Sequence, residues 1–230
     1  AWQPFALAKD DECPALAAYL KGLMHTAPAR AVFKFCRATL RSRWIENLLG
    51  GTTIYVLRDP ADMIAAYRAR QDGDYFHSGI LRIVLLNTDA PVLAPAAALL
   101  TARHPDLRKL DDDALCANKL CHVIPMLERI ALAAHLWLLS LAAHCRAGVL
   151  VVDAADFAEV AVQQAISEAT GLDCELTDAR PLDARGGVDV NFADPGWRAA
   201  AIDALACLGD VSPLPSAARR YAHLVEGLLA

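Results

Sequence analysis

Two spacings of hydrophobic positions recur along the chain and predict its secondary structure. Short apolar or β-branched runs at 31–36, 52–57 and 148–153 predict strands. Apolar residues three or four positions apart predict helices, and the run at 80–87 fits a strand and a helix equally well. The helical patterns lie at 16–23, 37–49, 60–70, 96–103, 114–147 with a break near Pro125, 161–170, 197–208 and 216–229.

The order of these elements predicts an α/β fold. A strand, a helix, a strand and a helix follow one another over 31–70, which predicts a βαβ unit with a right-handed crossover. The run at 148–153 is continuous in Val and Leu, as is typical of a parallel strand buried on both faces. We therefore expect one α/β domain over 1–230, in three layers, with a parallel sheet flanked by helices.

The junction between the strand at 52–57 and the next helix has a well-defined start signal. Asp59 is a favourable N-cap, Pro60 suits the first helical position, and Asp62 adds negative charge to the first turn. Arg58 precedes them at the carboxyl end of the strand, which is where ligands bind in open α/β sheets. The junction therefore predicts an anion-binding turn.

Four basic residues fall on the first predicted strand, the helix after it and this junction: Lys34, Arg37, Arg41 and Arg58. If the two strands are neighbours in a parallel sheet, Lys34 and Arg58 approach one edge, and such a group predicts a phosphate or sulfate site. The alternative is a structural one: Arg37 and Arg41 on a solvated helix face, Arg58 paired with a neighbouring aspartate, and Lys34 reaching to water.

Composition narrows the class of protein. Lys and Arg total 22 against 27 Asp and Glu, a net charge of -5, which argues against non-specific nucleic-acid binding. Seven cysteines without tight spacing, and no leader pattern at the start, predict a cytoplasmic protein with reduced thiols. The apolar stretch at 130–143 is shorter than the roughly 18 residues of a spanning helix, so we expect a buried helix and no membrane span.

Three segments together resemble a known family. They are KFCRATLRSRW at 34–44, IYVLRDPADMIAAY at 54–67 and LVVDAADF at 150–157. They resemble the sulfotransferases that use 3'-phosphoadenosine-5'-phosphosulfate (PAPS), and look closest to the bacterial members. The resemblance implies the P-loop-type sulfotransferase fold, PAPS as donor with no metal ion, and transfer of a sulfuryl group to a hydroxyl or amine of a small-molecule, glycan or lipid acceptor.

The resemblance also implies roles for particular residues. Arg58 matches the arginine that binds the 3'-phosphate of the nucleotide, and Lys34 matches the lysine that stabilises charge on the transferring sulfuryl group. Arg37 and Tyr67 are further nucleotide-binding candidates. Arg185, before Gly186 and Gly187, resembles part of a C-terminal phosphate loop; the alternative there is a flexible surface loop.

The chain also departs from the family pattern. Ala66 replaces the usual serine for the 3'-phosphate, and Cys36 replaces a histidine base, so either another group is the base or the acceptor is easily deprotonated. His77, in a loop after the Arg58 helix, is a candidate base. The glycine-containing phosphosulfate loop is absent, so we expect that the first strand-loop-helix unit is missing or that this site is lost. The alternative function is a non-catalytic binding or scaffolding domain with a degenerate nucleotide site.

Other candidate residues have structural interpretations. Cys116, Cys121 and His122 lack a second ligand pair at zinc-like spacing, so helix packing is favoured over a metal site. His135 and His144 lie on the apolar helix and are expected in or at the core. The polar segment 177–191 is the predicted mobile loop or lid.

Overall fold

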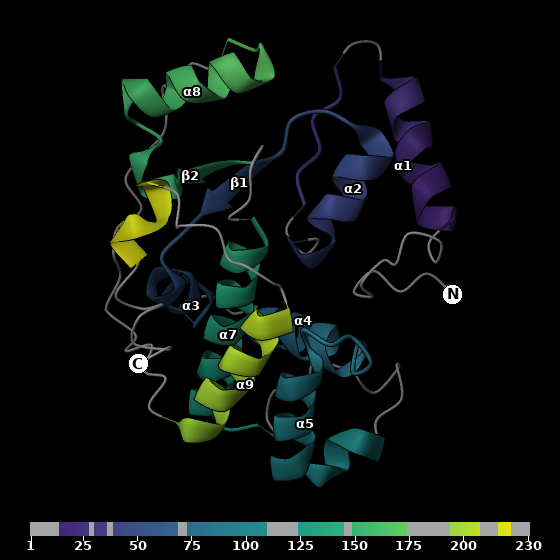
Figure 1. The fold of residues 1–230 in the computed structure, drawn as a ribbon, viewed down its shortest axis with the longest axis vertical. Helices are drawn as coiled ribbons and strands as arrows, with labels where there is room; N and C mark the ends of the chain where they lie inside the picture. The colour runs from purple at the N-terminus through teal and green to yellow at the C-terminus, as the bar shows by residue number, and fades with distance from the viewer. Residues whose placement is uncertain are drawn as a thin grey trace.

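A computed structural model describes residues 14–27, 30–35, 39–68, 73–109, 124–144, 149–173, 194–207 and 216–221. This part of the chain is mostly helical and contains a small parallel sheet (Figure 1). In chain order the elements are α1 (Pro14–Thr26), η1 (Thr39–Arg41), α2 (Ser42–Leu49), β1 (Ile54–Leu57), α3 (Pro60–Arg68), α4 (Gly73–Leu85), α5 (Ala94–Arg103), η2 (Pro105–Lys109), α7 (Met126–His144), β2 (Leu150–Asp153), η4 (Ala154–Asp156), α8 (Val160–Thr170), α9 (Pro195–Cys207) and η5 (Ser216–Tyr221).

The sheet pairs two of the three predicted strands. β1 and β2 are parallel, with Ile54 opposite Leu150 and Leu57 opposite Asp153. The strand predicted at 31–36 is wrong for its described part, because 31–35 is coil and the described sheet contains β1 and β2 alone. A β-branched and aromatic run forms a strand only when it finds a partner edge, and this run has none in the structure. The described helices and the two-stranded parallel sheet are compatible with the predicted α/β fold.

Most of the helix predictions are confirmed. The patterns at 96–103, 161–170 and 197–208 are α5, α8 and α9, and 37–49 becomes η1 followed by α2. The ambiguous run at 80–87 is helical as far as Leu85, where α4 ends. This helix begins at Gly73, so His77 lies on a helix and the loop placement was wrong. The segments 114–123, 177–191 and 222–229 lie outside the described residues.

Two helices begin with the same Asp-Pro signal. Asp59 Oδ1 accepts hydrogen bonds from the backbone N–H groups of Ala61 at 2.7 Å and Asp62 at 3.4 Å, which confirms the predicted N-cap of α3. At α9, Asp194 Oδ1 accepts from Gly196 N at 2.9 Å and from the next residue at 3.3 Å. In both helices a carboxylate occupies the positive end of the helix dipole.

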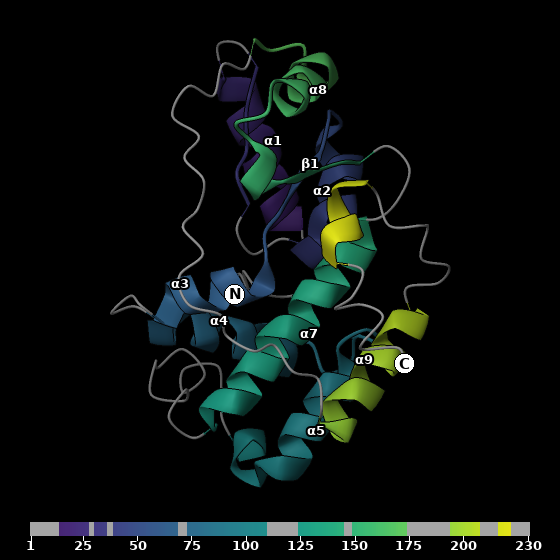
Figure 2. The same cartoon turned by 90° about the vertical axis from the view of Figure 1, so that its left-hand side faces the viewer.

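Helix α7 is the centre of the packing. It runs from the sheet past α4 and α9 (Figure 2) and packs against α3, α4, α9 and η1. Within the described residues it is the one helix long and apolar enough to cross a membrane, yet most of it is buried against protein, as expected for a core helix. His135 and His144 are buried on it, which confirms their predicted core position.

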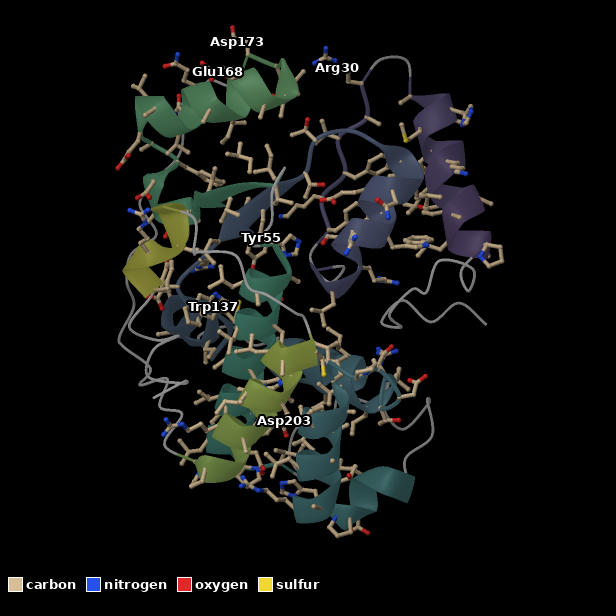
Figure 3. The ribbon with its side chains drawn as sticks, in the orientation of Figure 1. Arg30, Tyr55, Trp137, Glu168, Asp173 and Asp203 are labelled. Atoms are coloured by element: carbon tan, nitrogen blue, oxygen red, sulfur yellow. The ribbon has the colours of Figure 1, made fainter. Side chains whose placement is uncertain are left out.

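The sheet rests on the carboxyl-terminal end of α7. Tyr55 of β1 stacks on His144 with ring centroids 4.2 Å apart, and Figure 3 shows Tyr55 above this end of the helix. Leu57, at the end of β1, is fully buried in a cluster with Trp137, Leu138 and Leu141 of α7. The core of the helices thus continues under the sheet and fixes where its carboxyl edge lies.

Candidate functional site

The carboxyl edge of the sheet brings together two polar residues. Arg58 directly follows β1, and Asp153 is the last residue of β2. The parallel register places Leu57 opposite Asp153, so Arg58 leaves the sheet beside that aspartate. This edge of a parallel sheet is the general position of ligand sites in α/β proteins.

Trp137 holds the Arg58 turn in place. Its indole Nε1 donates a hydrogen bond to the Arg58 carbonyl oxygen at 2.9 Å, and its side chain is 7% exposed on α7. The ring also packs edge-on against Tyr221, with centroids 5.5 Å apart. The backbone from which the Arg58 side chain extends is therefore attached to the core helix, on which Figure 3 labels Trp137.

Asp153 has a structural role at this edge. Its side chain is buried, Oδ1 accepts from Ala155 N at 2.8 Å, and Oδ2 accepts from the Tyr221 hydroxyl at 2.7 Å. Both carboxylate oxygens are thus engaged by the protein, as buried carboxylates require. Asp153 therefore connects β2 to η4 and η5 through hydrogen bonds. Arg58 supplies the positive charge at this edge.

The guanidinium of Arg58 has no acidic partner within the described part of the chain. The residue is half-buried, and its Nε is buried with no hydrogen-bond partner. Among the residues that the structure describes it forms no ion pair, and Asp59 instead caps α3. The pairing of Arg58 with Asp59 or Asp62, the structural alternative, is not observed. A half-buried guanidinium without an acidic partner is suited to bind an external anion.

The other sequence-predicted residues are not brought to this edge. Lys34 is exposed on coil, so its predicted position on a strand next to β1 is wrong. Arg41 is buried where η1 packs against α7, and not on a solvated face. Tyr67 lies on α3 and His77 on α4, in segments whose side chains are outside the description, and Arg37 and Arg185 are outside it altogether.

A second charged cluster joins three helices at the opposite end of α7. Arg103 of α5 forms a bidentate pair with Asp194, with both N···O distances 2.8 Å, and donates to Glu128 at 3.1 Å. His104 Nε2 lies 2.5 Å from the other oxygen of Glu128. The Arg103 hydrogen bonds lower the pKa of Asp194 to about 2, and the same contacts raise the pKa of Arg103.

This cluster joins α5, α7 and α9, and its charged groups are already paired with one another. Its acidic groups are occupied by Arg103, His104 and the N–H groups of α9. Across the described ranges no group of three His, Cys, Asp or Glu side chains has the spacing to hold a metal ion. Cys116, Cys121 and His122, for which the sequence favours helix packing over a metal site, lie outside those ranges.

Sequence reasoning missed three residues of the carboxyl edge: Trp137, Asp153 and Tyr221. Two signals were present, since Asp153 ends a buried apolar run and an indole within an apolar helix needs a hydrogen-bond acceptor. Their partners, however, lie 68 and 79 positions away in the sequence. Comparisons with protein families, curated proteins and solved structures find no match for this chain.

Proposed function

We propose that this chain is a sulfotransferase-type α/β domain with Arg58 as its anion-binding residue. The ligand would be PAPS, with its 3'-phosphate at Arg58, and a sulfuryl group would pass to a hydroxyl or amine of a small-molecule, glycan or lipid acceptor. The observation that carries the proposal is Arg58 at the carboxyl end of β1, which is half-buried, has no partner for its Nε, and forms no ion pair with the residues that the structure describes. The segment IYVLRDPADMIAAY, which contains it, supplies the resemblance to the family.

The surroundings of Arg58 favour a phosphate over a weakly charged ligand. A guanidinium presents a planar fork of donors that matches two phosphate oxygens, and partial burial strengthens the attraction. The Asp59 carboxylate is used at the start of α3, so it does not neutralise Arg58 directly. The Trp137 hydrogen bond fixes the backbone of the turn, so the turn loses little conformational freedom when an anion binds.

The proposed reaction is an in-line displacement. The acceptor oxygen or nitrogen forms a bond to sulfur while the bond from sulfur to the bridging phosphate oxygen breaks, and 3'-phosphoadenosine-5'-phosphate leaves. The acceptor proton passes to a base, for which His77 is the candidate. Lys34 would stabilise charge on the sulfate oxygens, and Arg37, Tyr67 and Arg185 would contribute to nucleotide binding. The lysine and the arginines supply the positive charge, so the scheme invokes no metal ion.

A non-catalytic binding domain is the second candidate, and one observation favours it. Lys34 is exposed on coil and not at the end of a strand, so the cation required for sulfuryl transfer is not fixed at the sheet edge. A nucleotide bound by Arg58 alone would then serve a binding or scaffolding role.

Calorimetric titration with 3'-phosphoadenosine-5'-phosphate tests the binding site. We expect the wild type to bind and Arg58→Ala to bind about tenfold or more weakly, since a charge-assisted contact contributes about 1.5–3 kcal/mol. Arg198→Ala is the matched control, because Arg198 is a half-buried arginine on α9. A wild type that shows no binding at millimolar ligand contradicts the proposal.

Transfer of labelled sulfate from PAPS separates the two candidate functions. The sulfotransferase predicts label on an acceptor from a panel of phenols, sugars and amines, with loss of transfer in Lys34→Ala and unchanged nucleotide affinity. Nucleotide binding without transfer to any acceptor would favour the binding domain.

A further inference from the structure

Helices α1 and α8 bury few of their side chains. The buried residues of α1 are Leu16 and Leu20, which pack against α2, and the buried residue of α8 is Ile166. Both helices lie at the end of the molecule away from α5 (Figure 1 and Figure 2). Helices in proteins are stabilised mainly by packing of an apolar face, and these two leave most of their surface uncovered.

Exposed apolar side chains gather on these two helices and on the coil at 30–35. Tyr19 of α1 is 60% exposed, Val32 of the coil is 80% exposed, and Val160 of α8 is 78% exposed. Further exposed apolar residues of the two helices and the segment after α8 are Leu23, Met24 and Leu172. Exposed apolar surface that is concentrated in one region is typical of an interaction site between proteins.

The two helices also carry opposite charge. Segment 14–35 contains α1 and the coil, and its Lys, Arg, Asp and Glu residues are all basic: Lys21, Arg30 and Lys34. Segment 154–173 contains α8, and its residues of these types are all acidic: Asp156, Glu159, Glu168 and Asp173. Arg30 Nη1 donates to the carbonyl oxygens of Thr170 at 2.6 Å and Gly171 at 3.1 Å, so its contact with α8 is to the helix end and not to a carboxylate. One end of the molecule therefore presents a basic surface and an acidic surface.

We propose that this end is the interface of a symmetric dimer, in which α1 of one protomer packs against α8 of its partner. A two-fold axis through this end forms the same contact twice, because each protomer supplies one α1 and one α8. The basic segment of one protomer then faces the acidic segment of its partner, and exposed apolar side chains of both become buried.

Charge selects this arrangement over the other symmetric ones. A dimer that pairs α1 with α1 brings Lys21 and Lys34 of two protomers together, and one that pairs α8 with α8 brings Glu168 and Asp173 together. Like charges that meet at an interface are unfavourable, whereas the pairing of α1 with α8 is attractive at both contacts. The inference does not depend on nucleotide binding at Arg58.

Sedimentation equilibrium of the wild type measures the association directly. At about 100 μM chain and about 0.05 M salt we expect the mass of two chains, and at about 0.5 M salt we expect a Kd about tenfold higher, because exposed charges are screened. A monomer at the lower salt concentration would overturn the proposal. Species larger than a dimer would overturn the two-fold arrangement, since a contact that repeats without closure forms chains.

Two charge reversals identify the surfaces that meet. Lys21→Glu and Glu168→Lys each change an exposed residue, so both variants should fold, which circular dichroism verifies. Each variant alone has like charges at both contacts, and we expect its Kd to be about tenfold or more above that of the wild type. The matched control is Asp203→Lys, which makes the same change of charge as Glu168→Lys at an exposed position of α9, away from both surfaces (Figure 3). It should dimerise as the wild type does.

An equimolar mixture of Lys21→Glu and Glu168→Lys tests the reciprocal contact. In the mixed dimer the acidic α1 of the first variant meets the basic α8 of the second, and the other contact has its natural charges. We expect the mixture to recover the dimer with a Kd within about threefold of the wild-type value. A mixture that associates no better than its components, or a control that weakens the dimer as much as the two reversals do, would contradict this interface.

Discussion

Single buried residues hold the carboxyl edge of the sheet, and Tyr221 is the clearest case. Its hydroxyl donates to the buried Asp153 carboxylate at 2.7 Å. We predict that Tyr221→Phe lowers the free energy of unfolding by about 1–3 kcal/mol, because the buried carboxylate loses the hydrogen bond from this hydroxyl. Urea unfolding measures this change. Tyr19→Phe, at a residue that is 60% exposed, should be neutral; equal stability of both variants would contradict the structural role of Asp153.

His135 predicts a specific dependence of stability on pH. It is fully buried, its ring nitrogens have no hydrogen-bond partner, and burial lowers its pKa from 6.5 to about 4. Between these values the unfolded chain binds a proton that the folded chain does not. The stability contributed by this difference is complete above pH 6.5 and falls by about 3 kcal/mol as the pH drops to 4.

The variant His135→Leu isolates this effect. We predict that its free energy of unfolding depends less on pH between 6.5 and 4 than that of the wild type, since the titrating group is gone. Urea unfolding at several pH values measures the stability of both proteins. The control is His25→Gln, at an exposed histidine on α1. If stability changes with pH in the same way in wild type and His135→Leu, folding does not lower the pKa of His135.

At the scale of single residues, the sequence predicts the features that are determined by neighbours in the chain. The placement of Arg58 at a strand end followed from the run before it and the Asp59-Pro60 signal after it. Trp137 and Tyr221 could not be assigned, because their partners are set by tertiary packing and not by neighbours in the chain. That Arg58 forms no ion pair with the other described residues is likewise a property of the packed structure.

Among the elements, α9 shows how one residue can cap a helix and join it to its neighbours. Asp194 caps α9 and pairs with Arg103, with side chains that are 40% and 35% exposed. We predict that Asp194→Asn costs about 1 kcal/mol or less at pH 7, because the cap survives and the exposed ion pair is weak. Asp194→Ala should cost about 1 kcal/mol more through the lost cap.

The pH dependence of stability distinguishes the contribution of the Asp194 charge from the contribution of its helix cap. Its pKa is about 2 in the folded chain against an ordinary 3.8, so its contribution is present above pH 3.8 and is lost as the pH falls toward 2. In urea unfolding, the stability difference between wild type and Asp194→Asn should therefore narrow below pH 4. A difference that stays constant down to pH 3 would contradict the ion pair.

Strands were harder to predict than helices for a physical reason. The helix at 161–170 carries its own stop signal, Gly171, which adopts a φ of 63° at the end of α8. The run at 31–36 has equally clear β-forming residues, but a strand also needs a partner edge, which no local pattern supplies. α4 shows the converse, since packing against α7 extends the ambiguous run at 80–87 into a longer helix.

At the scale of the whole molecule, most of the described residues are in helices and few are in the sheet. The sequence predicted an α/β protein with a buried central helix, and both features are present. It did not predict that α4, α5, α7 and α9 would form the largest apolar cluster, away from the sheet. Which helix faces meet depends on contacts between distant segments, and amphipathic patterns alone do not specify them.

The central claim is that Arg58 recognises the 3'-phosphate of a nucleotide at the edge of the sheet. Titration of wild type and Arg58→Ala with 3'-phosphoadenosine-5'-phosphate and with adenosine 5'-monophosphate, which lacks that phosphate, tests it most directly. We predict that the wild type prefers the first ligand by about tenfold to a hundredfold and that Arg58→Ala loses the preference. An equal preference in both proteins would contradict the account.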